Sequence, residues 1–228
     1  VAPDAGSTVV VGTGYYRNLV VGNEVSDGMS GIQLWISCME NVVSGNTVTR
    51  MRRPGFYLYA NGTTLASSMP RTWNRGVSPL FFNRIEGNRT DTCSAGALVT
   101  SGDYAGVPIE FPRAVGNVLS RNSFVSNRTQ GVILRSRKGG AAQSDPSPSI
   151  VGTLVEYNVV RDAPAAFQAS YGSRHSVFHR NHAYFWHTAP KGEEKPAGFV
   201  LEGDAGSTVL RDNVVEGREI GRASCRER

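Results

Sequence analysis

The stretch NVVSGNTVTR, residues 41–50, decides the fold because its pattern returns along the chain. Related stretches are NLVVGNEVSD from residue 18, NVLSRNSFVS from residue 117 and STVLRDNVVE from residue 207. In each stretch one asparagine has an apolar residue three positions before it and another two positions after it. A motif that recurs every few tens of residues is typical of a repeat architecture, whose units stack on one another.

Seven copies of the motif align on their asparagine. The aligned residues are Asn23, Asn46, Asn83, Asn122, Asn158, Asn181 and Asn213. They are separated by 23, 37, 39, 36, 23 and 32 residues, which indicates a unit of about 23 residues with insertions in some copies. Five positions earlier, every copy has a small residue that can hydrogen-bond, such as Asn18, Asn41 or Thr208.

A second motif follows each asparagine after a short polar turn. It begins with a small residue and alternates apolar side chains, as in GIQLW, GFYLY, GALVT, GVILR, AAFQA and GFVLE. Such alternation is typical of a strand with one buried face. Each unit is therefore predicted to contain three short strands and three turns. No segment has the 3.6-residue apolar period of a helix.

A unit of this size cannot bury its own apolar face, but coiling the chain so that each strand lies over its predecessor creates a continuous core. Neighbouring coils are then about 4.8 Å apart, and equivalent side chains stack. At a corner between two strands, an inward asparagine is expected to adopt the left-handed backbone conformation that a tight bend needs. Its amide is expected to bond to the asparagines above and below it.

These motifs resemble the right-handed parallel β-helix repeat family, the fold of pectin and pectate lyases. The resemblance covers nearly all of residues 1–217 and implies an all-β, single-stranded right-handed parallel β-helix of about seven coils. The domain is expected to span residues 1–218. Because the repeated residues are those that build the coil, the asparagines are predicted to be structural.

The last ten residues, EIGRASCRER at 219–228, break the strand alternation. They resemble the translation of a sequencing-adapter oligonucleotide and are predicted not to belong to the fold. The chain is accordingly expected to be a solenoid truncated partway along its coils.

Composition narrows the expected partners. The 228 residues carry a formal net charge of +5. The sequence contains no run of 18 apolar residues, so no membrane-spanning helix is predicted. The arginines do not cluster with aromatic residues in a nucleic-acid-binding motif, so an acidic polysaccharide fits a basic β-helix better than a nucleic acid does. Cys38, Cys93 and Cys225 are too scattered for a metal site or a disulfide framework.

The glycine-led strand is expected to carry the binding surface, because in the resembled family its outward side chains usually form the floor of a groove. Alternation directs one set of residues inward: Ile32, Leu34, Phe56, Leu58, Val132, Leu134, Phe199 and Leu201. It directs another set outward: Gln33, Trp35, Tyr57, Tyr59, Ile133, Arg135, Gln168, Ser170, Val200 and Glu202.

Three outward rings on neighbouring coils are predicted to form an aromatic platform. The rings are those of Trp35, Tyr57 and Tyr59. The predicted substrate-binding residues are Trp35, Tyr57, Gln33, Gln168 and Arg137. Long insertions after the glycine-led strand, at residues 61–77, 101–116 and 136–152, are expected to wall this face. The open alternative is that these loops cover the rings.

Candidate catalytic residues lie on the same face. Glu202 is its outward acid, and no second acid occupies a matching position on an adjacent coil, so the paired carboxylates of a glycoside hydrolase are not evident. A lyase acting on uronic acids instead needs a cation and a base. Arg135, with Arg137, is the candidate cation, and Tyr59 or His187 is the candidate base.

All four histidines lie between residues 175 and 187. Strand alternation prevents them from converging on one point, so no metal site is predicted. His179 and His182 are expected to straddle an asparagine corner and to face solvent. The resemblance alone makes calcium a candidate cofactor.

Two functions from different classes are therefore expected. The first is a polysaccharide lyase-like enzyme, secreted, periplasmic or on the surface of a bacterium. The second is a non-catalytic β-helix that binds glycan or serves as a cell-surface adhesin module.

Overall fold

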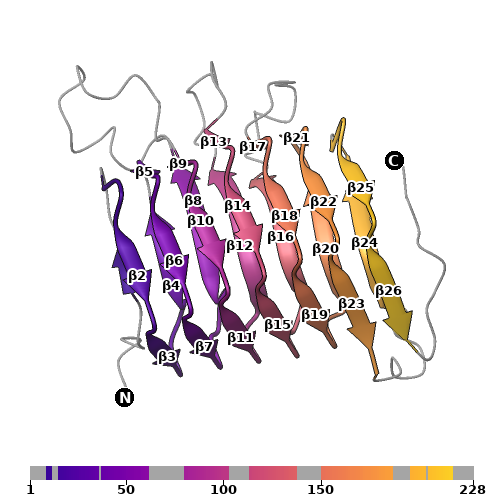
Figure 1. The fold of residues 1–228 in the computed structure, drawn as a ribbon, viewed down its shortest axis with the longest axis horizontal. Helices are drawn as coiled ribbons and strands as arrows, with labels where there is room; N and C mark the ends of the chain where they lie inside the picture. The colour runs from indigo at the N-terminus through magenta and orange to yellow at the C-terminus, as the bar shows by residue number, and fades with distance from the viewer. Residues whose placement is uncertain are drawn as a thin grey trace.

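The computed structural model describes residues 9–11, 15–35, 37–61, 80–102, 113–137, 150–186, 196–203 and 205–217. These residues form parallel strands that lie side by side in chain order from the N-terminal to the C-terminal end (Figure 1). The described ranges contain no helix, and hence none that could cross a membrane. The predicted tail at residues 219–228, His187 and most of the insertions lie outside the described residues.

The strands form four parallel sheets, which we name A to D. Sheet A contains β1 (Val9–Val11), β4 (Ile32–Trp35), β8 (Phe56–Asn61), β12 (Ala95–Gly102), β16 (Gln130–Arg137), β20 (Ala165–Ser170) and β24 (Ala197–Glu202). Sheet B contains the two-residue strands β5 (Cys38–Met39), β9 (Leu80–Phe81), β13 (Ala114–Val115), β17 (Ile150–Val151) and β21 (Ser173–Arg174).

The other two sheets each have seven strands. Sheet C contains β2 (Leu19–Val21), β6 (Val42–Ser44), β10 (Arg84–Glu86), β14 (Val118–Ser120), β18 (Leu154–Glu156), β22 (Val177–His179) and β25 (Val209–Arg211). Sheet D contains β3 (Glu24–Ser26), β7 (Thr47–Thr49), β11 (Arg89–Asp91), β15 (Ser123–Val125), β19 (Val159–Arg161), β23 (His182–Phe185) and β26 (Val214–Gly217).

This arrangement is a right-handed parallel β-helix of seven coils, as predicted. Each strand pairs in parallel with the equivalent strands of the preceding and following coils. The prediction of three strands per coil was wrong, because five coils have a fourth strand of two residues in sheet B. Strands this short are too brief to show an alternating pattern in the sequence.

The core is made of inward columns that run along the coils. In sheet A, the predicted inward residues Ile32, Phe56 and Val132 are no more than 1% exposed. Near the C-terminal end, Phe167 stacks on Phe199 with ring centroids 5.1 Å apart. Registered stacking of like side chains therefore buries apolar surface continuously along the axis, which no single coil achieves.

The asparagines form a hydrogen-bonded ladder at the corner between sheets C and D, as predicted. Asn122 shows the pattern: its backbone N–H and its Nδ2 both donate to Asn158 Oδ1, at 3.0 and 2.9 Å. Its own Oδ1 accepts from the backbone N–H and Nδ2 of Asn88, both at 3.0 Å. The remaining Nδ2 hydrogen bonds to Ile85 O at 2.8 Å. Every polar atom of this buried amide is satisfied, so the ladder stabilises the coil rather than costing energy.

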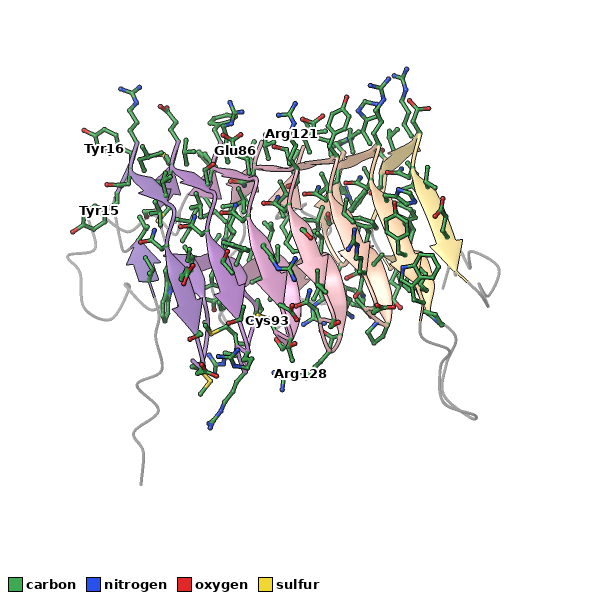
Figure 2. The ribbon with its side chains drawn as sticks, turned by 60° about the horizontal axis from the view of Figure 1, so that its bottom comes forward. Tyr15, Tyr16, Glu86, Cys93, Arg121 and Arg128 are labelled. Carbon is green, nitrogen blue, oxygen red and sulfur yellow. The ribbon has the colours of Figure 1, made fainter. Side chains whose placement is uncertain are left out.

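The left-handed backbone was assigned to the wrong residue of the corner. Positive φ belongs to the residue before each ladder asparagine, such as Gly45 at 63°, Arg121 at 54° and Tyr157 at 53°. Figure 2 shows Arg121 directed away from the coil. The bend turns at this outward residue, because the asparagine itself must stay in register to bond to its neighbours on both sides.

The register of the third copy was also wrong. The ladder asparagine of that coil is Asn88, which accepts from Asn46 and donates to Asn122, and Ile85 pairs with Val43. Asn83 belongs instead to a second ladder, between sheets B and C, with Asn18, Asn41 and Asn117. The two corners lie five residues apart and both use asparagine. The apolar pattern selects Asn83, between Leu80 and Ile85, because the residue two positions after Asn88 is Thr90.

Packing against sheet D explains why a small residue stands near the start of the sheet A strands. A Cβ atom at Gly55 would lie 2.5 Å from the Thr90 methyl carbon, and one at Gly131 would lie 2.5 Å from a Val160 methyl carbon. The inward residue of sheet D thus fills the space that a side chain would need. The one coil with alanine in this position, Ala166, has the small Ala183 in register with Val160.

Cysteines and sequons on the coil are buried. Cys38 and Cys93 are buried thiols, and burial raises the pKa of the Cys38 thiol to about 11. Asn88 and Asn127, which begin two of the chain's N-x-T sequences, are also buried, with their side chains bonded inside the solenoid.

Candidate functional site

The outer face of sheet A carries two columns of side chains in strict register. One column runs along the axis through Gln33, Tyr57, Leu98, Ile133, Gln168 and Val200. The second runs beside it through Trp35, Tyr59, Thr100, Arg135, Ser170 and Glu202. The structure thus brings together seven of the nine predicted site residues on one face.

The aromatic platform lies at the N-terminal end of this face. The Trp35 and Tyr59 rings meet edge to face with centroids 6.0 Å apart, and Tyr57 and Tyr59 lie 5.5 Å apart at a tilt of 36°. Trp35 is 39% exposed, whereas both tyrosines are partly buried. Solvent therefore reaches the platform at the Trp35 ring, so the platform is not completely covered.

The middle of the face is less accessible than alternation predicts. Thr100, Ile133, Gln168 and Ser170 point outward by register, yet each is less than 9% exposed. Alternation specifies the direction of a side chain, whereas its burial depends on the neighbours that close over it.

A chain of hydrogen bonds crosses three coils of the face. Gln130 Nε2 donates to Gln168 Oε1 at 2.9 Å, and Gln168 Nε2 donates to Glu202 Oε2 at 3.2 Å. Gln168 is thereby fixed at both ends of its amide. Glu202 Oε2 accepts from the Gln168 amide, which Gln130 fixes in turn. This hydrogen-bond chain therefore orients the Glu202 carboxylate.

Arg135 and Glu202 lie on either side of Ser170 in the second column. Two coil steps separate their backbones by about 10 Å. Arg135 is exposed and forms no ion pair with any described residue. Ser170 is fully buried between them, and its Oγ has no hydrogen-bond partner among the described residues. A cation and a carboxylate thus flank a small hydroxyl side chain.

Two predicted site residues are not placed in full. His187 lies outside the described residues, and Arg137 ends β16 in register with Gly102, although its side chain is not described. The predicted base Tyr59 lies two coils from Arg135, with Thr100 between them.

The described histidines lie on other faces. His179 and His182 straddle Asn181, as predicted, on the outer sides of sheets C and D. His179 Nε2 is 3.5 Å from Asp212, and His182 Nδ1 lies 2.7 Å from the Tyr184 hydroxyl.

A calcium ion needs six to eight oxygen ligands. Over the part of the chain that the structure describes, no three or more His, Cys, Asp or Glu residues converge. Glu202 is the single carboxylate in the two outer columns. The described residues therefore do not fit calcium on this face.

The sequence pattern missed Gln130, Thr100 and Ser170 as members of the site. Ser170 was predicted to face outward, but its position between a cation and a carboxylate depends on the residues of the neighbouring coils. Strand register places Thr100 next to Arg135 and Ser170 between Arg135 and Glu202. Gln130 is in register with Ala165 and reaches Gln168 only through its side chain.

Comparison with known proteins adds two structural neighbours. An alginate lyase from Paenibacillus sp. str. FPU-7 aligns with 94% of this chain and 76% of its own, at 15% identity and a TM-score of 0.47. XylC, from its complex with xylose, aligns with 95% of this chain and 39% of its own, at 10% identity and a TM-score of 0.47. No protein-family model and no curated protein matches the chain.

Proposed function

We propose that this β-helix binds an acidic polysaccharide along the outer face of sheet A and cleaves it by β-elimination. The observation that carries the proposal is the second outward column, which aligns rings, an exposed guanidinium and an oriented carboxylate along one axis. Exposed rings stack on the apolar faces of sugars, and a guanidinium pairs with a sugar carboxylate. A polymer of uronic acids presents both groups repeatedly.

In this proposal Arg135 neutralises the carboxylate of a uronate unit, which acidifies the proton on the adjacent carbon. Glu202 is the base that takes this proton, because it is the carboxylate of the two outer columns, it lies two coils from Arg135, and Gln168 holds it in place. The released electron pair forms a carbon–carbon double bond, and the glycosidic oxygen leaves with its bonding electrons and gains a proton. Gln168 positions the base through its bond to Oε2. Such a substrate is extracellular, which fits a secreted, periplasmic or cell-surface protein of a bacterium.

The binding prediction concerns three variants of the outer face. Trp35→Ala and Tyr59→Ala are expected to weaken glycan binding roughly 3- to 10-fold each, because each removes a stacking ring. Arg135→Gln is expected to weaken binding of uronate polymers about 10- to 100-fold while sparing neutral ones, because it removes a charge-assisted bond. Isothermal titration with a panel of uronate and neutral oligosaccharides measures all three.

Matched controls lie at the corner between sheets C and D. Tyr157→Ala and Arg121→Gln remove an exposed ring and an exposed guanidinium there, and should leave binding unchanged. In 1 M salt the Debye length shortens to about 3 Å, so the difference between the parent and Arg135→Gln should shrink, while the loss in Trp35→Ala persists. If the outer-face variants bind like the controls, the binding site lies elsewhere.

Absorbance of the unsaturated product separates cleavage from binding alone. The parent should generate this absorbance with at least one uronate polymer, and Glu202→Gln should abolish it while retaining affinity, because only proton removal is lost. Retention of glycan without turnover by the parent would instead support the non-catalytic binding or adhesin module.

A further inference from the structure

Gln130 is linked to the candidate base Glu202 through a third side chain. It is the first residue of β16, and the backbone register pairs it with Ala165 rather than with Gln168. Its Nε2 nevertheless reaches Gln168 Oε1, at 2.9 Å, and Gln168 Nε2 reaches Glu202 Oε2, at 3.2 Å. Gln130 therefore lies at the far end of a relay of two hydrogen bonds that joins three neighbouring coils.

The carboxylate at one end fixes the direction of the whole relay. An ionised carboxyl group can only accept hydrogen bonds, so Glu202 needs a donor from Gln168. Gln168 supplies this donor with Nε2, and its Oε1 is thereby turned toward Gln130. The side chain at position 130 must then donate. Both bonds are satisfied in one direction, from Gln130 to Glu202.

The middle of the relay is shielded. Gln168 is 8% exposed, and the side chains in register with it, Ile133 and Val200, are apolar. Neither of these two neighbours can replace a lost hydrogen bond. A Gln168 amide that turns over to satisfy one bond therefore breaks the other, and leaves a buried polar group unsatisfied.

We propose that Gln130 is a positioning residue for Glu202, which it controls through the orientation of the Gln168 amide. With a donor at position 130, Gln168 presents Nε2 to the carboxylate and holds it. With an acceptor there, Gln168 turns and presents Oε1, which repels the carboxylate. The catalytic consequence rests on the proposed function: a displaced base abstracts the proton more slowly, while the rings and Arg135 continue to hold the polymer.

Thermal unfolding of a double-mutant cycle tests the relay without substrate. Gln130→Glu is expected to lower the melting temperature by about 3–6 °C, because the Gln168 amide then meets a carboxylate at each end and its oxygen must face one of them. Adding Glu202→Gln should recover more than half of this loss, since both hydrogen bonds then form in the opposite direction. The new amide at position 202 donates to Gln168 Oε1, and Gln168 Nε2 donates to the new carboxylate at position 130.

Two controls separate the relay from simple charge balance. Gln168→Met has a similar length but no amide, so in its background the rescue by Glu202→Gln should largely disappear. Thr129→Val removes a hydrogen bond to Ser94 O at the same corner but outside the relay, and its effect should add to that of Glu202→Gln. A rescue of equal size in the Gln168→Met background, or additive effects of Gln130→Glu and Glu202→Gln in the parent, overturns the proposal.

Turnover of a uronate polymer tests the positioning role. Gln130→Met is expected to lower kcat roughly 10-fold while KM changes less than about twofold, because the base is misplaced and the binding surface is intact. Thr129→Val should retain the parental kcat. A kcat that Gln130→Met leaves unchanged overturns the positioning role. A parent without turnover overturns the proposed function and the positioning role with it, while the thermal cycle still decides whether the relay exists.

Discussion

Replacing Asn122 with Leu is expected to lower the free energy of unfolding by about 3–5 kcal/mol. The two side chains have similar sizes, so the cost comes from hydrogen bonds. Asn88 loses the acceptor for its backbone N–H and its Nδ2, and Ile85 O and Asn158 Oδ1 each lose a side-chain donor. All of these groups are buried in a stack that admits no replacement partner. Thermal unfolding should shift down by on the order of 10 °C.

The control variant lies one residue away. Arg121→Gly changes the left-handed corner residue, and its effect should stay below about 1 kcal/mol, because relief of backbone strain and the greater entropy of the unfolded chain oppose each other. Equal melting temperatures for Asn122→Leu and Arg121→Gly would show that the ladder does not stabilise the solenoid.

The second large effect is expected at the start of a sheet A strand. Gly55→Ala should destabilise the protein by about 2–3 kcal/mol, because the new methyl group would lie 2.5 Å from the Thr90 methyl carbon. The backbone oxygen of Gly96, at 3.1 Å, leaves little room for the strand to retreat. Chemical denaturation measures this loss as a lower midpoint at an unchanged slope.

Thr90→Ser gives this prediction a specific rescue. Serine lacks the clashing methyl group but keeps the hydroxyl that bonds to Asn127. Combined with Gly55→Ala, it should recover more than half of the lost stability, whereas Thr90→Ser alone should be mildly destabilising. If the two changes add without coupling, the clash is not what excludes a side chain from this position.

The sequence predicted which side chains of the candidate site face outward, but not their burial or their hydrogen bonds. Alternation along GIQLW and GFYLY correctly placed Trp35, Tyr57 and Tyr59 on one outer face, because strand geometry fixes the direction of each side chain. It did not predict that Gln168 would be buried and bonded to Glu202. Those contacts join residues 34 positions apart, and insertions of variable length hide the register between them.

The sequence by itself determined the architecture of this protein. Stacking requires the same residue types at equivalent positions of every coil. The sequence therefore repeats the pattern that specifies the fold: asparagines, small residues and alternating apolar residues. Only the tertiary structure decided which asparagine belongs to which corner, since Asn83 has apolar residues at both defining positions whereas Asn88 is followed by Thr90, and yet Asn88 lies in the ladder. The hydrogen bond from Asn46 to Asn88 settles this register, because a ladder bond forms only between residues brought level by the coil.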